Sequence, residues 1–374
     1  MRFHLLPMLL ALPAVSGCGL LGLSEKDDPA AEPGAWKPLS LTHLHLELEE
    51  LGPVPSNDLL PPTASPDGNW VAYLKIPPGP RPPFTSLFTG QGLERVALAV
   101  RAAQPGASER VVCPAGAAWP AWSPDGRHVA YAVAETERSC HLAVHDVAAG
   151  TTRRLPVRRA WIVRPVLSPD GRTAAVGVCT GPAWDGRLHA VDLATGDLSP
   201  APRPAGLRWQ FPVQWRDRKE AVLLQRGRDA AFCQWRPGST AGQRLARTST
   251  PAEQLDAVRA FAGVNLPLSP DRGRLAHYDP NAGRLTVVDL AGGGATPLPP
   301  GTRSGCWFGA DYFLAATETA LILVYVRTGE SRRLLRGRWL PLWADERSRQ
   351  ALACTASDEP GALQLVRLRF RTAR

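Results

Sequence analysis

A four-residue phrase, Ser-Pro-Asp-Gly, recurs along the chain and constrains its fold more than any other feature. Complete copies stand at 65–68, 123–126 and 168–171, and a degenerate copy with one extra residue spans 269–273. Three weaker copies keep the aspartate of the phrase. The aspartates of all copies are Asp67, Asp125, Asp170, Asp217, Asp271, Asp311 and Asp345. They lie 34 to 58 residues apart with a mean of about 46, which is the length of a four-stranded propeller blade.

Each copy belongs to a repeat with the same internal order. A short apolar segment leads into the turn, where Pro fixes φ and Gly supplies a positive φ. Two alternating segments follow, such as 128–133 and 141–147, and then a Gly-bearing turn and a short fourth segment, such as 332–335. Unrelated hairpins of a β-sandwich have no reason to repeat this order. The sequence therefore predicts an all-β fold, a single β-propeller of seven four-stranded blades.

The two ends of the repeat array predict how the ring closes. The last repeat supplies an inner segment at 339–343 and strands at 350–355 and 363–370, but no outer strand. Residues 41–48 alternate strictly and have no blade of their own. As the outer strand of the seventh blade, this amino-terminal strand would close the ring and remove an exposed sheet edge. A ring of six or of eight blades is the alternative. The helix-like stretch 251–261 is expected to be an insertion between blades four and five.

The amino-terminal residues have the features of an export signal. Arg2 precedes an apolar stretch from 5 to 15 that is too short to span a bilayer, so residues 1–17 are predicted to be a signal peptide. The next residues, Val-Ser-Gly-Cys ending at Cys18, resemble the bacterial lipobox. That resemblance implies cleavage before Cys18 and lipidation of its thiol. An ordinary secretory signal with a coincidental cysteine is the alternative.

Residues 18–37 carry this cysteine and are rich in small, acidic and Pro residues, so we expect a flexible tether before a propeller at 38–374. Several acyl chains, at about 0.8 kcal/mol for each buried CH₂, anchor a protein without a transmembrane helix. Gly19 follows the cysteine, and in enterobacterial-type sorting the absence of Asp there favours the outer membrane. We therefore expect a lipoprotein of the bacterial cell envelope, held in the outer membrane and facing the periplasm.

The basic charge does not indicate a nucleic-acid partner. The formal net charge is +9, from 43 Lys and Arg against 34 Asp and Glu, and nearly all of the basic residues are arginines. They are scattered along the chain, whereas nucleic-acid-binding proteins more often have basic runs or a basic helix. The codon usage of a GC-rich genome accounts for arginine in place of lysine. We expect a monomer with no nucleic-acid partner.

The repeat resembles the WD40-like β-propeller repeat of TolB-type periplasmic proteins. The resemblance covers about residues 40–371 and is strongest in blades one, two, three and five. It implies the fold rather than one activity, because scaffolds, peptidase propellers and some lyases share this repeat. TolB pairs its propeller with a peptidoglycan-associated lipoprotein. The lipobox and the resemblance together favour a lipid-anchored module that binds or scaffolds a protein or an anionic ligand in the cell envelope.

Motifs for enzymatic chemistry are not evident in the sequence. A peptidase propeller accompanies a hydrolase domain with a Gly-x-Ser-x-Gly elbow, and residues 238–242, Gly-Ser-Thr-Ala-Gly, do not form one. None of the eight histidines lies in an inner-strand segment, so we expect no channel metal, no cofactor and no catalytic residue. The alternative is a propeller enzyme, lyase- or lactonase-like, with its site residues in loops at the channel mouth.

The inner segments line the axis of a propeller, and here they combine arginine with tryptophan. The candidate partner-binding residues are Arg164, Arg208, Trp209, Arg303, Arg338 and Trp339, accompanied by Trp119, Trp122 and Trp161. Packing between blades can account for most of the tryptophans. Arginines that converge on one axis repel one another unless an acidic group is bound, and Arg beside aromatic residues is typical of interaction hot spots. We expect an anionic partner, an acidic peptide or an anionic envelope glycan, bound with salt-sensitive affinity.

Six cysteines remain besides the lipidation site: Cys113, Cys140, Cys179, Cys233, Cys306 and Cys354. Export would place them in an oxidising compartment where disulfides form. Six cysteines allow 15 pairings. Counting along the blades brings Cys140 and Cys179 to the same face in neighbouring blades, so this pair is a candidate disulfide. Buried free thiols are the alternative.

Overall fold

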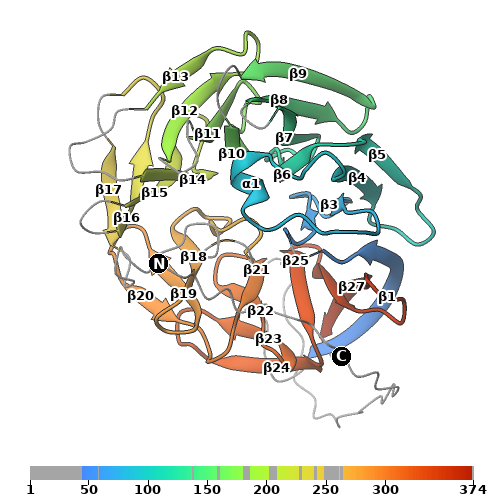
Figure 1. The fold of residues 1–374 in the computed structure, drawn as a ribbon. Coiled ribbons are helices and arrows are strands. Elements are labelled where there is room, and N and C mark those ends of the chain that lie inside the picture. Colours follow the sequence, from blue (N-terminus) through green and yellow to red (C-terminus); the bar gives the residue numbers. More distant parts are fainter. Residues whose placement is uncertain are drawn as a thin grey trace.

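The strands form a ring of blades around a central channel (Figure 1). The computed structural model describes residues 44–57, 59–136, 139–157, 161–179, 186–201, 209–226, 230–239, 242–247, 261 and 264–372. Within them lie seven antiparallel sheets, one for each repeat. The prediction of a seven-bladed propeller is confirmed, including the weak fourth, sixth and seventh blades.

The strands follow one another around the ring in sequence order. Blade one consists of β2 (Thr63–Ala64), β3 (Trp70–Lys75), β4 (Ala97–Ala102) and β5 (Glu109–Cys113). Blade two consists of β6 (Ala117–Trp122), β7 (His128–Thr136), β8 (Ser139–Asp146) and β9 (Thr151–Val157). Blade three consists of β10 (Trp161–Leu167), β11 (Thr173–Cys179), β12 (Arg187–Asp192) and β13 (Leu198–Pro200). Blade four consists of β14 (Trp209–Trp215), β15 (Ala221–Arg226), β16 (Ala230–Trp235) and β17 (Gln243–Arg247).

The remaining blades complete the circle. Blade five consists of β18 (Arg274–Asp279), β19 (Arg284–Asp289) and β20 (Ala295–Pro297), and a bridge between Leu268 and Leu275 places the segment before β18 on its inner side. Blade six consists of β21 (Ser304–Phe308), β22 (Tyr312–Ala316), β23 (Ala320–Tyr325) and β24 (Ser331–Arg336). Blade seven consists of β25 (Trp339–Asp345), β26 (Gln350–Ala356), β27 (Ala362–Thr372) and β1 (Leu44–Pro55).

Each Ser-Pro-Asp-Gly turn is held by its own side chains. In blade two, the Ser123 hydroxyl donates to Asp125 Oδ1 (2.5 Å) and accepts from the His128 N–H (2.9 Å). The same two contacts recur in the turns that begin at Ser65, Ser168 and Ser269. The turns join the first and second strands of their blades. We call the face of the ring that they form the turn face, and the opposite face, where second strands lead into third strands, the connection face.

The first strand of each blade has a free edge toward the channel, and proline and tryptophan cover part of it. Four inner strands carry a proline at or beside a bulge, namely Pro120, Pro165, Pro212 and Pro341. Proline lacks an N–H, so the edge offers fewer donors to another strand. Indole N–H groups satisfy carbonyls across blades, in the pairs Trp122–Thr63, Trp215–Val166, Trp307–Pro267 and Trp343–Pro66, over 2.7 to 3.1 Å.

The ring is closed by strands from the two ends of the described chain. β1 pairs with β27 in antiparallel register over its whole length, so blade seven has the order β1-β27-β26-β25 (Figure 1). The predicted amino-terminal closing strand is confirmed. It runs beyond its expected end at residue 48, because a bulge between Glu50 and Gly52 lets the pairing continue. Gly52 has φ 107°, a backbone conformation that favours glycine.

Arg101 of β4 ties the closing strand to blade one. Its side chain is buried, and its guanidinium donates to the carbonyls of Pro53 (2.8 Å) and Leu51 (2.5 Å) on β1. In the opposite direction, Arg367 of β27 donates to the carbonyl of Ala103 in blade one. Hydrogen bonds from charged donors are stronger than those between neutral groups. These arginines therefore hold the seventh blade against the first.

Replacing Arg101 by Met should lower the free energy of unfolding by about 2–4 kcal/mol, because two buried carbonyls lose a charged donor. Urea denaturation followed by tryptophan fluorescence measures the effect. Arg333→Met changes an exposed arginine on the outer strand β24 and should shift the free energy of unfolding by less than about 0.5 kcal/mol. Equal losses in the two variants would contradict a role for Arg101 in closure.

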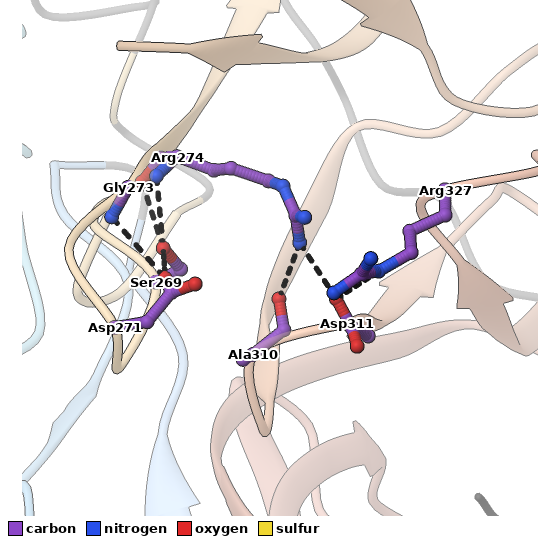
Figure 2. Close-up of polar contacts among 7 residues, drawn as sticks. All are labelled: Ser269, Asp271, Gly273, Arg274, Ala310, Asp311 and Arg327. Atoms are coloured by element: carbon purple, nitrogen blue, oxygen red, sulfur yellow. Dashed lines mark hydrogen bonds and ion pairs between the residues drawn. The ribbon is translucent and has the colours of Figure 1, made fainter. Parts of the chain in front are cut away.

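Arginine also joins blades five and six on the turn face, beside the turn that begins at Ser269 (Figure 2). Arg274 Nη1 donates to the carbonyl of Ala310 (2.8 Å) and to Asp311 Oδ1 (2.9 Å). Arg327 Nε donates to the same carboxylate oxygen (2.7 Å). Burial raises the pKa of Asp311, but the hydrogen bonds from Arg327 and Arg274 outweigh it and hold the pKa below its usual value. The junction is thus stabilised by a charged carboxylate between two cations.

The Asp311→Asn variant should be less stable than the wild type by about 1 kcal/mol at neutral pH, and the difference should vanish in acid. The depressed pKa means that the carboxylate stabilises the fold above its unfolded pKa of about 3.9. That stabilisation is lost as the pH falls through the folded pKa. Thermal melts at decreasing pH should therefore converge. A difference that persists into acid would mean that Asp311 acts by packing and not by charge.

The candidate Cys140–Cys179 disulfide is wrong. Cys140 is a buried thiol whose Sγ accepts a hydrogen bond from the Ile162 N–H (3.2 Å), and burial raises its pKa to about 12. The side chain of Cys179 lies outside what the structure describes. The other described cysteines are also buried thiols: Cys113, Cys233, Cys306 and Cys354. Cys140 packs as a small apolar residue in the interior of the sheets.

Some expectations fall outside the described residues. They are the signal peptide at 1–17, the tether at 18–37 and most of the helix-like stretch at 251–261. A short helix that the sequence did not predict, α1 (Ser86–Thr89), stands between β3 and β4. In the described ranges, no helix is long and apolar enough to cross a membrane.

Candidate functional site

A cavity of about 420 Å³ occupies the channel on the side of the turn face, and all seven blades contribute to its wall. Its rim is formed at the turns by Pro66, Pro124, Pro270, Arg272 and Asp345. Trp119, Arg164 and Phe261 also line it, and the first two lie earlier in their inner strands than the turns. The cavity is therefore a well that extends from the turn face toward the middle of the ring.

The wall of the cavity is largely apolar. Prolines from five blades line it: Pro62, Pro120, Pro165, Pro267 and Pro341. The lining tryptophans Trp122, Trp307 and Trp343 already donate their indole N–H groups to carbonyls of neighbouring blades. The wall consequently offers ring faces and aliphatic carbons to a ligand and few hydrogen-bonding groups.

Aromatic side chains pack around the deeper part of the channel. Phe261 stacks on Phe211 of β14, with ring centroids 6.4 Å apart and planes 6° apart. The indoles of Trp119 and Trp161 donate to one carbonyl, that of Leu87 in α1, each over 2.6 Å. The insertion that carries α1 therefore docks onto the inner strands of blades two and three and fixes both indoles.

Strand bulges orient the side chains at the bottom of the well. Trp119, Arg164 and Leu266 each precede a proline and have left-handed backbone, with φ of 54°, 45° and 51°. In blades two and three the antiparallel register shifts at this position. A bulge breaks the alternation of side chains along a strand. All three of these left-handed residues line the cavity, each together with the proline that follows it.

Arg164 brings a positive charge into this apolar well. Its guanidinium carbon lies 5.5 Å from the ring centroid of Phe211 and 5.2 Å from that of Phe261. Burial lowers its pKa to about 10, and no charged group counteracts this shift, so the side chain is still a cation at neutral pH. Cation–π contacts compensate only part of the desolvation. Among the described residues, no carboxylate forms an ion pair with Arg164.

A second cation, Arg272, stands at the rim. It occupies the turn position that glycine fills in the complete copies: φ is 60° at Arg272 and 66–72° at Gly68, Gly126 and Gly171. Left-handed backbone costs an ordinary residue about 1–2 kcal/mol. The side chain is exposed, and no described carboxylate is paired with it. Arg272 is not among the residues predicted from the sequence, although the displacement of glycine by one position in the degenerate turn was a usable signal.

Several other polar side chains of the cavity are engaged within the protein, whereas the buried Thr63 Oγ1 has no hydrogen-bond partner among the described residues. Asn265 Nδ2 donates across the channel to the carbonyls of Ala64 (3.2 Å) and Leu342 (2.5 Å), in blades one and seven. Gln214 Oε1 accepts the N–H of Leu268 (2.9 Å). At the rim, the Asp345 carboxylate accepts the N–H of Ser348 (2.8 Å) within its own turn. The cations that the cavity offers to an external ligand are Arg164 and Arg272.

The structure does not gather the six predicted partner-binding residues into one site. Arg303 is exposed and pairs with Glu318 (2.8 Å). Arg338 is exposed, and Trp339 is half-buried with its indole donating to the Arg336 carbonyl (3.0 Å). These three residues lie at the connection-face ends of β21 and β25, and none of them lines the cavity.

Of the other three predicted residues, Arg164 lines the cavity. Arg208 is outside the described residues, and Trp209 begins β14 with its side chain not described. The predicted inner segment of blade seven ended at residue 343, whereas β25 continues to Asp345. The carboxylate of Asp345 therefore reaches the rim of the cavity.

Histidines and acidic residues do not cluster into a metal site in the part of the chain that the structure describes. His277 is fully buried, its Nδ1 lies 3.2 Å from the Tyr278 carbonyl, and burial lowers its pKa. It packs edge-on against Phe232 at a centroid distance of 5.3 Å. This histidine belongs to the packing between blades and not to the cavity.

No protein-family model matches the sequence, and no curated protein matches it. Solved structures do match. TolB from Acinetobacter baumannii superposes with a TM-score of 0.48 and 17% identity, over 83% of this chain and 67% of that chain. An oligogalacturonate lyase in complex with manganese gives a TM-score of 0.53 and 12% identity, over 86% of this chain and 99% of that chain.

An acylaminoacyl peptidase in complex with a chloromethyl ketone gives a TM-score of 0.55 and 15% identity. The match covers 84% of this chain and 51% of the peptidase, so this chain spans about half of the peptidase's length. At such identities the likeness concerns the fold alone. A peptidase and a lyase share it, so the fold by itself assigns no activity.

Proposed function

We propose that this protein is a lipid-anchored β-propeller of the bacterial cell envelope that binds or scaffolds a protein or an anionic ligand. The observation that carries the proposal is Arg164, a desolvated cation that lines the channel cavity with no carboxylate partner among the described residues. An acidic group supplied by a partner would stabilise this charge. Arg338 and Trp339 on the connection face are further candidate contacts, together with Arg208, Trp209 and Arg303.

The proposed anchor rests on the amino-terminal sequence. Residues 1–17 supply the signal peptide, Cys18 the lipidation site and residues 18–37 a tether between membrane and ring. Gly19 supports retention in the outer membrane, with the propeller in the periplasm. In this arrangement a monomeric ring presents its channel to envelope components.

Replacing Cys18 by Ala should release the protein from the membrane as a soluble periplasmic species or leave it uncleaved. The thioether bond to diacylglycerol requires the thiol of Cys18, and each lost acyl chain removes many buried CH₂ groups. Membrane fractionation and labelling with radioactive palmitate measure the effect, and Cys354→Ala, a change at a buried thiol of β26, is the matched control. The lipobox assignment would be refuted by a Cys18→Ala protein that fractionates and labels like the wild type.

The propeller should bind an acidic polymer in a salt-sensitive manner, because the proposed contacts are arginines. Poly-L-glutamate represents an acidic peptide, alginate represents an anionic glycan, and neutral dextran is the control polymer. Arg164→Gln and Arg338→Gln should each weaken binding about tenfold, the loss of one charge-assisted contact. Arg333→Gln on the outer strand should have no such effect. The proposed function would be contradicted by an affinity for the acidic polymers that does not change with salt concentration. An equal affinity for dextran would also contradict it.

A further inference from the structure

We propose that the channel cavity is a binding site for a small, elongated organic anion that places a carboxylate on Arg164, its apolar body along the proline and tryptophan wall, and a second acidic group near Arg272. This proposal deepens the proposed function by naming a class of ligand, and it rests on that function. It assigns the well on the turn face, and not the connection face, as the small-molecule site.

The bottom of the well supplies the first element of recognition. Arg164 is held by packing on Phe211 and Phe261 and by a bulge that turns its side chain into the cavity. Trp119 and Leu266 have the same backbone conformation at matching points of blades two and five, and neither is charged. A packing role is therefore met by an uncharged residue at this position in other blades. The guanidinium of Arg164 adds a fork of donors that fits a carboxylate.

The wall supplies the second element. The cavity that the wall encloses has a volume of about 420 Å³, which lies in the usual range of small-molecule sites. Such sites are mostly apolar, with a few polar groups that fix the orientation of the ligand. The lining indoles have used their N–H groups within the protein. A hydrated or strongly polar ligand would lose its water there without gaining hydrogen bonds. The wall therefore selects a ligand with an apolar body.

The rim supplies the third element. Arg272 adopts a left-handed backbone conformation at the position where the complete turns have glycine, and its charge lies at the mouth of the well. A strained non-glycine residue beside a cavity is a reason to look for function, because the strain brings the fold no benefit of its own. Asp345 stands on the same rim but is engaged by backbone N–H groups of its turn. A ligand with acidic groups at both ends would meet a cation at each end of the well.

Three related probes separate these elements. Hydrocinnamamide is neutral, hydrocinnamate has one carboxylate, and para-carboxyhydrocinnamate has a carboxylate at each end of the same apolar body. Isothermal titration calorimetry is performed on the full mature lipoprotein in phospholipid nanodiscs, with empty nanodiscs as the blank. We expect the affinity to rise from the amide through the monoacid to the diacid.

Variants assign the two carboxylates. Arg164→Gln should weaken hydrocinnamate binding by about tenfold or more, and Arg164→Lys should recover part of that loss. Arg272→Gly should lower the affinity for the diacid to about that for hydrocinnamate. Arg333→Gln on the outer strand β24 is the matched control and should bind all probes as the wild type does.

The stability of the unliganded variants gives an independent readout. Arg272→Gly should raise Tm, because it relieves left-handed backbone. Arg164→Gln should not lower Tm, because a desolvated charge is removed from a place where no described carboxylate compensates it. If Arg164 served only the fold, its replacement would lower Tm. Circular dichroism confirms that each variant is folded before binding is measured.

The outcomes separate the two proposals. Equal affinity for the amide and the acids, or unchanged hydrocinnamate binding by a folded Arg164→Gln protein, would overturn the small-anion site. The same holds if no probe binds. If acidic polymers nevertheless bind with salt sensitivity through Arg164, the proposed function stands without this ligand class. If the acidic polymers do not bind while the small probes bind at Arg164, the small-anion site stands, and the proposed binding of acidic polymers is wrong.

Discussion

Closure of the ring by β1 against β27 is the interaction on which the rest of the structure depends. A blade buries its faces only against the blades beside it, so an open ring would expose two of them. One buried cluster contains Leu51 of β1, Tyr73 of blade one and Leu342 of blade seven, so the closing strand is also part of the core between the first and last blades. Asn265, in blade five, bonds to carbonyls of the same two blades across the channel. Closure therefore determines both the stability of the ring and the width of its channel.

The fold was predictable from the sequence because its determinants are local and repeated. The Ser-Pro-Asp-Gly turn satisfies its own backbone groups wherever it occurs, as the contacts of Ser123 show, and so it marks each blade without help from the rest of the chain. The closing strand was predictable from alternation and from the missing outer strand of the last repeat. The amino-terminal bulge at Gly52 and the helix α1 were not, because they depend on tertiary partners such as Arg101 and the indoles of Trp119 and Trp161.

The site was harder to predict, because the direction of a side chain in an inner strand depends on bulges. Arg164 and Arg303 both belong to inner segments, yet a register shift turns Arg164 into the cavity while Arg303 meets Glu318 near the connection face. Alternation alone cannot separate these cases. Nor could the sequence show that Trp122, Trp307 and Trp343 use their indole N–H groups between blades, which makes the wall of the cavity apolar.

Two residues that line the channel, Arg164 and Arg272, have unfavourable free-energy contributions that the residues at the matching positions of several other blades do not have. Glycine at the fourth turn position removes the cost of left-handed backbone in blades one, two and three, while Arg272 in blade five incurs about 1–2 kcal/mol for the same geometry. An uncharged residue at the bulge removes the desolvation cost in blades two and five, while Arg164 in blade three retains it. Both costs occur at residues that line one cavity, and both would be compensated by the same event, the arrival of a negatively charged ligand. Blades one to three have glycine at the turn position and blades two and five have an uncharged residue at the bulge, so the fold does not require these arginines, and this contrast supports the proposed ligand site.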